Sequence, residues 1–212
     1  MNENNSEKSQ DVYSRTAGTY SRLGEPYLEA ISKGSPPELP DFIKLLPSHA
    51  DVLDVGTAGG RDAKVFADAG MHVTGVDTVD VFLGKARKDV PNATFIKMDM
   101  RALDFPEKSL DGIYANASLI HLKKDEVPPV LENFYRMLRQ GGKLHIRVKE
   151  GEGEQEIAEK LSQNEKRFFA FYTQIELEQL ITAARFKILR SRIIPDDFGR
   201  SDLKWVSVWG EK

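Results

Sequence analysis

The sequence predicts an α/β protein with a doubly wound, mostly parallel sheet of seven strands that ends in an antiparallel C-terminal edge hairpin. Three observations support this prediction. Short apolar runs alternate with amphipathic segments between residues 51 and 149. A glycine-rich turn at 56–60 follows the first apolar run. Two apolar runs close the chain with a short polar loop between them, which is typical of neighbouring antiparallel strands.

Length and composition indicate a single domain. The chain has 212 residues, enough for a substantial core, and we expect a disordered polar tail at 1–10 followed by one domain at 11–212. A net charge of −3 argues against a nucleic-acid partner. The chain has no cysteine, no apolar segment typical of a signal peptide and no apolar run near the ~20 residues of a membrane helix. We therefore expect a cytoplasmic protein without a membrane partner.

The elements before the sheet are helical. Aromatic and apolar residues recur at helical spacing over 11–31, which predicts one or two short helices with a tyrosine-bearing face. The sequence GSPP at 34–37 ends this pattern, and a short helix is predicted at 40–46.

The alternating pattern then defines the parallel part of the sheet. Strands are predicted at 51–55, 72–76, 93–98, 110–115 and 143–149, and helices at about 60–69, 79–88 and 124–138. Such alternation implies right-handed crossovers between parallel strands.

The pattern changes after residue 149. The charged segment 150–166 predicts one polar helix through Ile157, Ala158 and Leu161, with GEGEQE as a solvated loop that has no metal-site spacing. An aromatic cluster follows at 168–172, and Thr173 is placed to cap a helix at 174–184. Strands at 186–194 and 204–209 form the closing hairpin, and we expect Trp205 and Trp209 to pack on the edge strand.

The glycine turn and the end of the second strand predict a ligand site. In VLDVGTAGGRDA, glycines at a strand-to-helix turn let a ligand approach the backbone closely. The following helix presents unpaired N–H groups at this point. Asp77 ends the second strand 21 residues after Gly56, where its carboxylate can accept hydrogen bonds from ribose hydroxyls. We therefore expect a ligand that contains a ribose.

Five segments together resemble the class I S-adenosylmethionine-dependent methyltransferases: VLDVGTAGGRDA, VTGVD, FIKMDMRAL, LDGIYANASLIHL and NFYRMLRQGGKLHI. The pattern Tyr13-Ala17-Tyr20 is also similar to the N-terminal helix that closes over the cofactor in small members. The chain departs from the family at Ala58, where the middle glycine usually stands. The resemblance implies a Rossmann-like methyltransferase fold and contacts between S-adenosyl-L-methionine and Tyr13, Tyr20, Asp54, Gly56, Thr57, Ala58, Gly60, Asp77, Thr78, Met98, Asp99, Met100 and Asn116.

Two side chains after the fourth strand are candidates for catalysis. His121 lies where a parallel sheet gathers its ligands, and its titration range suits proton abstraction at neutral pH. The structural alternative is a histidine that bonds a nearby carbonyl or packs over the cofactor. Asn116 faces the transferable methyl group in the family, although it can instead satisfy local backbone groups. His145, inside the fifth strand, is expected to be structural.

Cations at the end of the fifth strand are candidates for substrate contact. Alternation places Arg147 and Lys149 on one face, where they can steady an anionic substrate or pair with acids of the following segment, at positions 150, 152 and 154. We assign Arg147 to ion pairing and Lys149 to the substrate site. The full set of candidates for substrate contact is Tyr27, Lys149, Arg167 and Tyr172.

The expected activity is methyl transfer to a small-molecule acceptor by in-line displacement, in a monomer or homodimer. We expect residues 11–46 to form lid helices and residues 150–172 a substrate-pocket insertion. A nicotinamide-dependent oxidoreductase is the main rival, but Ala58 and Arg61 break its G-x-G-x-x-G pattern. A non-catalytic nucleoside-binding module also remains open. An RNA-modifying methyltransferase remains open too, because RFFAFYTQIELEQL is similar to small tRNA-modifying members.

Overall fold

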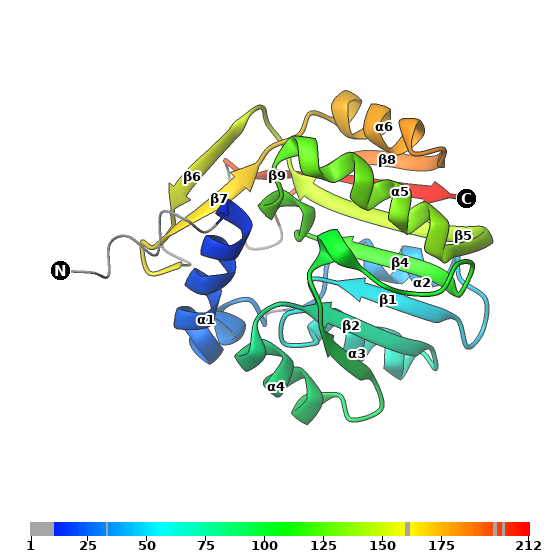
Figure 1. Cartoon of the computed structure of the whole chain (residues 1–212), viewed down its shortest axis with the longest axis horizontal. Coiled ribbons are helices and arrows are strands. Elements are labelled where there is room, and N and C mark those ends of the chain that lie inside the picture. Colours follow the sequence, from blue (N-terminus) through cyan, green and yellow to red (C-terminus); the bar gives the residue numbers. More distant parts are fainter. Residues whose placement is uncertain (1–10, 33, 160–161, 197–198, 201) are drawn as a thin grey trace.

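The computed structural model describes residues 11–32, 34–159, 162–196, 199–200 and 202–212 (Figure 1). Within this part of the chain, seven strands form one sheet in the order β3-β2-β1-β4-β5-β9-β8. The neighbouring strands from β3 to β5 pair in parallel, whereas β9 runs antiparallel to both β5 and β8. The strands are β1 (Asp51–Val55), β2 (His72–Asp77), β3 (Thr94–Lys97), β4 (Leu110–Asn116), β5 (Leu138–Lys149), β8 (Lys187–Pro195) and β9 (Lys204–Glu211). The predicted fold class is confirmed.

Helices cover both faces of the sheet. One core cluster joins the sheet to α5 (Val127–Met137) and α6 (Gln174–Ala183). A second joins it to α2 (Leu39–Ile43), α3 (Arg61–Asp68) and α4 (Asp80–Asp89). The central strands are therefore buried on both sides, which explains why they read as nearly continuous apolar runs. The predicted cap of α6 is also present, because the Thr173 hydroxyl accepts a hydrogen bond from the Glu176 N–H at 3.2 Å.

Helix α1 (Val12–Ala30) lies at the end of the sheet where the parallel strands finish (Figure 1). It is bent at Gly24, whose φ of 59° and ψ of −148° are non-helical. Pro26 follows the bend and suits the first turn of the second half, where its missing N–H is not needed. The sequence prediction of one or two short helices thus corresponds to one helix with a bend.

The predicted helix in 150–166 is wrong. Residues Glu154–Ala158 form strand β6, which pairs antiparallel with β7 (Lys166–Ala170) in a separate hairpin beside α1 (Figure 1). The sequence EQEIA consists mainly of helix-favouring residues, and most of the strand is exposed, so it shows no alternation of apolar and polar residues. Pairing with the buried aromatic strand β7 decides its conformation. The GEGEQE segment is accordingly a loop only up to Gly153.

Three smaller expectations also need correction or lie outside the described residues. Strand β9 lies between β5 and β8, so Trp205 and Trp209 are buried side chains of an interior strand, not edge-strand packing. Strand β5 begins at Leu138, earlier than predicted, and its register with β4 shifts between Leu110 and Gly112. The predicted tail at 1–10 and residue Leu161 lie outside the part of the chain that the structure describes.

Candidate functional site

A cavity of about 530 Å³ lies at the carboxyl ends of β1, β2 and β4, beneath α1. This is the edge at which open parallel sheets bind their ligands. Every residue predicted to contact the cofactor lines the cavity except Asp99. Of the predicted catalytic and substrate residues, the structure brings Asn116, His121, Tyr27, Lys149 and Arg167 to the cavity, but not Tyr172.

The glycine turn after β1 forms one wall of the cavity. Gly56 has a φ of +74°, and a Cβ added to it would lie 2.5 Å from Cβ of Ser118, so only glycine fits. Ala58 occupies the position of the usual glycine and has a φ of 47°. Alanine therefore adopts the left-handed backbone here at a modest cost in strain, and the departure from the family pattern leaves the turn intact.

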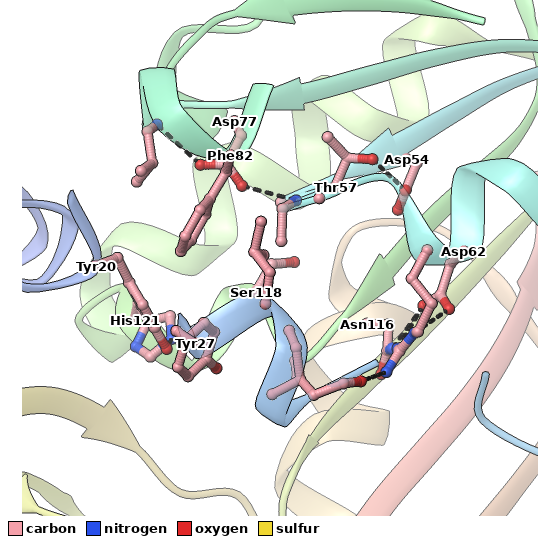
Figure 2. A pocket seen from close by; sticks show the side chains of 18 of the residues that line it. Tyr20, Tyr27, Asp54, Thr57, Asp62, Asp77, Phe82, Asn116, Ser118 and His121 are labelled. Carbon is pink, nitrogen blue, oxygen red and sulfur yellow. Dashed lines mark hydrogen bonds and ion pairs between the residues drawn. The ribbon is translucent and has the colours of Figure 1, made fainter. Parts of the chain in front are cut away.

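Asp77 is held by the backbone of two turns (Figure 2). Its carboxylate accepts hydrogen bonds from the N–H groups of Ala58 at 2.9 Å and Val79 at 3.0 Å. Burial raises the pKa of Asp77, and these backbone bonds act in the opposite direction. Each carboxylate oxygen keeps further acceptor capacity, so the group can also accept hydrogen bonds from a diol.

Asp54 is the second buried carboxyl at this edge. The Thr57 hydroxyl donates a hydrogen bond to it at 2.6 Å (Figure 2). Burial, reinforced by the nearby Asp62 carboxylate, raises the pKa of Asp54 to about 7. Asp54 therefore gains stabilisation from a positively charged ligand group.

Asp62 and Arg61 are cavity residues that the sequence interpretation did not select. The Arg61 guanidinium bonds both oxygens of Asp62, at 2.8 and 3.0 Å, and also donates to the Ile31 carbonyl at the end of α1. Asn116 donates to Asp62 at 2.9 Å (Figure 2). The signal for Asp62 was its place in the first turn of the helix after the glycine turn, where a carboxylate is favoured.

The predicted cofactor contacts at residues 98–100 are only partly present. Met98 and Met100 line the cavity. Asp99 instead caps the short helix η2 (Met100–Ala102) by accepting the Arg101 N–H at 2.9 Å, and it also forms an ion pair with the Arg101 side chain. In the structure Asp99 is thus a capping residue and does not line the cavity.

His121 lies in the short helix η3 (Leu119–His121) and contacts α1. Its Nδ1 lies 2.8 Å from the Phe168 carbonyl, which can only accept, so Nδ1 carries the proton. The Tyr20 hydroxyl then donates to Nε2 at 2.9 Å (Figure 2). Burial lowers the pKa of His121 to about 3, and the Arg167 and Lys149 cations act in the same direction. The imidazole is neutral throughout the physiological pH range.

Aromatic rings of α1 cover the cavity. Tyr20 and Tyr27 pack edge to face with 4.9 Å between ring centroids, and Tyr27 stacks on Phe82 of α4 at 5.9 Å. Tyr13 packs beneath the Arg101 guanidinium at 4.5 Å from its ring centroid. The tyrosine-bearing face that the helical spacing predicted therefore faces the cavity.

The cations of β5 bind acids other than those expected. Arg147 forms an ion pair with Glu38 at 3.3 Å, and Lys149 forms one with Glu159 at 2.7 Å. Tyr172 is buried in the sheet core, with Lys124 over its ring at 4.9 Å. His145 stacks on Tyr114 on the face of the second core cluster, away from the cavity, in agreement with its structural assignment.

The residues present fit a nucleoside ligand with a cationic amino-acid group. Asn116 and Ser118 line the cavity, and their Oδ1 and Oγ atoms are buried without a hydrogen-bond partner among the described residues. Burying polar atoms without a partner is costly, so a ligand that bonds them recovers free energy. Asp77 supplies diol acceptors, Asp54 supplies negative charge, and the glycine turn supplies close backbone approach.

The chain is similar to known methyltransferases and to a related S-adenosyl-L-methionine-dependent enzyme. A model of a methyltransferase domain matches residues 52–142. An S-adenosyl-L-methionine-dependent Diels-Alderase of Talaromyces variabilis is 33% identical over 109 residues, which cover 48% of this chain and 37% of that protein. The malonyl-[acyl-carrier protein] O-methyltransferase of Pectobacterium atrosepticum is 28% identical over 133 residues, which cover 62% of this chain and 49% of that protein. The match thus spans less than half the length of these curated relatives.

A solved structure is similar over nearly the whole chain. It is the 1,6-didemethyltoxoflavin-N1-methyltransferase of Burkholderia thailandensis, with bound 1,6-didemethyltoxoflavin and S-adenosylhomocysteine. The TM-score is 0.75 at 25% sequence identity, and the alignment covers 94% of this chain and 86% of that one.

Proposed function

Because this chain carries a class I S-adenosylmethionine-dependent methyltransferase domain, we propose that it transfers a methyl group to a small-molecule acceptor in the cavity beneath α1. The observation that carries the proposal is that the glycine turn and Asp77, joined by the hydrogen bond from the Ala58 N–H, lie together at one edge of the sheet. The solved relative with bound 1,6-didemethyltoxoflavin supports a small acceptor.

The protein's contribution to such a reaction is binding and orientation. S-adenosylmethionine supplies, when bound, an electrophilic methyl group on a positively charged sulfur. Asp77 would hold the ribose, the backbone at 56–60 and Asp54 would hold the amino-acid part, and Met98 and Met100 would flank the base. Holding two reactants in a fixed geometry removes much of the entropic cost of their encounter.

Exclusion of water is the second contribution. We propose that α1, within the lid region 11–46, covers the cavity and that residues of the 150–172 insertion form its acceptor side. Support comes from contacts between the two segments: the Thr16 hydroxyl accepts the Phe168 N–H at 3.1 Å, and the Thr19 hydroxyl donates to the Lys166 carbonyl at 3.2 Å. A closed, poorly hydrated cavity strengthens every polar contact to the reactants.

We propose that His121 acts as a neutral hydrogen-bond acceptor and not as the general base. Its Nε2 already accepts from Tyr20, and a group with a pKa of about 3 has little affinity for a substrate proton. The acceptor atom would then be one that is nucleophilic without base catalysis, such as an amine or an anion. Asn116 and Ser118, which line the cavity, would position it.

The test of the proposal is calorimetric titration of the full chain with S-adenosylmethionine, S-adenosylhomocysteine and NADH. We expect micromolar binding of the first two ligands and none of NADH. Asp77→Ala should weaken the binding about 10-fold or more, because it removes charge-assisted hydrogen bonds to the ribose. Asp111→Ala serves as the matched control, since Asp111 also lies on a parallel strand but ion-pairs with Arg139 away from the cavity.

The outcomes separate the competing functions. Binding of NADH alone would replace the proposal with an oxidoreductase. Tight binding of S-adenosylmethionine without release of S-adenosylhomocysteine in a broad acceptor screen would instead favour a nucleoside-binding or non-methylating role.

A further inference from the structure

Two cations on the acceptor side of the cavity share a single carboxylate. Lys149 at the end of β5 and Arg167 on β7, called here the cation pair, both line the cavity. Glu159 bridges them: one oxygen accepts from Lys149 Nζ at 2.7 Å, and the other contacts Arg167 Nη2. Positive charge on the two side chains therefore exceeds the negative charge of the acid that bridges them.

The cation pair is buried, whereas the bridging acid is not. The side chains of Lys149 and Arg167 are 5% and 2% exposed, and that of Glu159 is 24% exposed. Arg167 Nε has no hydrogen-bond partner among the described residues, and Glu159 occupies only one of the three N–H groups of Lys149. Burying a cation whose N–H groups lack acceptors costs free energy, and a ligand that accepts those hydrogen bonds recovers part of it.

Aromatic rings surround the pair and keep its geometry fixed. Lys149 Nζ lies 3.6 Å from the centroid of the Phe169 ring, and the Arg167 guanidinium lies 5.0 Å from the same ring and 5.1 Å from Tyr20. Arg167 Nη1 also donates to the Tyr20 hydroxyl at 2.6 Å, and Tyr20 in turn donates to His121. The donors thus point from a rigid, largely apolar wall, which suits an anion carried on a flat or apolar body.

We propose that the cation pair is the subsite for an anionic group of the methyl acceptor, a carboxylate or a phosphate, and that Glu159 occupies this subsite until the acceptor binds. Glu159 lies just after strand β6, outside any helix or strand, so its side chain can leave without breaking the hairpin. The proposal rests on the proposed function of the same cavity, to which it adds the chemical class of the acceptor.

The experiment is a titration of the full chain, saturated with S-adenosylhomocysteine, followed by NMR. The probes are benzoate, phenyl phosphate and benzamide, which share a ring and differ in charge. We expect at least one anion to bind about 10-fold or more tightly than benzamide, since hydrogen bonds to charged groups are the stronger ones. The tighter of the two anions identifies the group as carboxylate or phosphate.

Variants test the assignment to these residues. Lys149→Met should abolish the preference for the anions, whereas Lys143→Met, on the same strand but paired with Glu211 outside the cavity, should retain it. Glu159→Gln should raise the affinity for the preferred anion several-fold, because it removes the competing carboxylate. This second variant keeps the test decisive if Lys149→Met does not fold.

Several results would overturn the subsite. They are equal or tighter binding of benzamide, no binding of any probe, an anion preference that survives Lys149→Met, or weaker anion binding in Glu159→Gln. Binding of S-adenosylhomocysteine is measured first, for the wild type and for each variant. If the wild type binds it but shows no anion preference, the subsite fails and the proposed function stands. If the wild type does not bind it, the proposed function fails, and the same titration of the ligand-free protein decides the subsite.

Discussion

Asp54 and Asp77 lie at or near the ends of adjacent strands, yet different groups surround the two carboxylates. Asp77 accepts two backbone N–H groups, which stabilise its charge. Burial raises the pKa of Asp54 to about 7, the nearby Asp62 carboxylate adds to this effect, and the single hydrogen bond from the Thr57 hydroxyl offsets it only in part. The strand thus determines where each carboxylate lies, whereas the surrounding groups determine its proton affinity.

Asp54→Asn is expected to stabilise the ligand-free protein in a pH-dependent way. The folded pKa of about 7 exceeds the ordinary value of 3.8, so the wild type is penalised for the ionised group. This penalty is absent below pH 3.8, grows as the pH rises to about 7 and is constant above it. Thermal melting should therefore show a gain of roughly 5–10 °C for the variant at pH 8 and a smaller gain at pH 5.

The same variant should bind S-adenosylmethionine more weakly, because Asn keeps the bond to Thr57 but loses the charge. An equal gain in melting temperature at pH 5 and pH 8 would show that the wild-type carboxyl does not titrate in this range.

His121→Gln distinguishes a hydrogen-bond acceptor from a base. The glutamine oxygen can accept the Tyr20 hydroxyl in place of Nε2, so kcat/KM with an acceptor found by screening should stay within about 3-fold of wild type. His121→Ala, which leaves that hydroxyl without its acceptor, should lose about 10-fold. A general base would instead lose 10²–10⁴-fold in both variants, with loss of an ionisation from the pH profile.

At the scale of elements, the bend in α1 positions the aromatic cover of the cavity. Tyr20 precedes Gly24 and Tyr27 follows it, and the two rings pack against each other and against Phe82. The first half of the helix is also tied to the β6–β7 hairpin by ion pairs from Arg15 to Glu156 and from Arg22 to Glu165. The position of the Tyr27 ring relative to Tyr20 thus depends on the backbone conformation of Gly24.

Gly24→Ala should weaken cofactor binding while the fold is retained. A side chain at this φ and ψ costs on the order of 1–3 kcal/mol, which the helix can relieve by straightening and moving Tyr27. We expect the Kd for S-adenosylmethionine to rise about 5- to 100-fold in calorimetry. The matched control is Gly18→Ala in the same helix, where an added Cβ meets only Arg22 at 3.6 Å.

Because alanine favours a regular helix, Gly18→Ala should be neutral or slightly stabilising. Equal affinities for the two glycine variants would show that the bend is not needed for binding.

At the scale of the molecule, the stability of the sheet depends little on helix α1, which covers the cavity. Of the two core clusters on the sheet faces, one contains Tyr13 as its only buried member from α1, and the other contains none within the described residues. Leu28 of α1 belongs to a third, small cluster with Val79 and Phe82. Most of the apolar burial that stabilises the sheet therefore does not depend on α1.

Deletion of residues 1–33 should abolish turnover and leave the sheet folded. Circular dichroism should retain a cooperative thermal transition, while release of S-adenosylhomocysteine in the acceptor screen should fall below detection. Full activity of the shortened chain would refute the lid assignment, and loss of the cooperative transition would refute the separation of sheet and lid.

The sequence by itself determined the sheet and most of the residues that line the cavity at the ends of β1 and β2. The strands from β1 to β4 carry local signals, namely an apolar run, a glycine turn or a terminal acid, and such signals need no distant partner. Gly56, Asp54 and Asp77 could be selected because they lie at the ends of these strands.

Only the tertiary structure decided the features that depend on distant partners. Strand β6 has helix-favouring residues and becomes a strand by pairing with β7. Glu159 lies in a segment predicted to be helical, so its contact with Lys149 could not be expected. Asp99 forms an ion pair with Arg101. Trp205 lines the cavity because β9 is an interior strand. Ion pairs and strand pairing join residues that are far apart in the chain, so no local pattern reports them. The proposed acceptor side of the cavity is built almost wholly from such contacts.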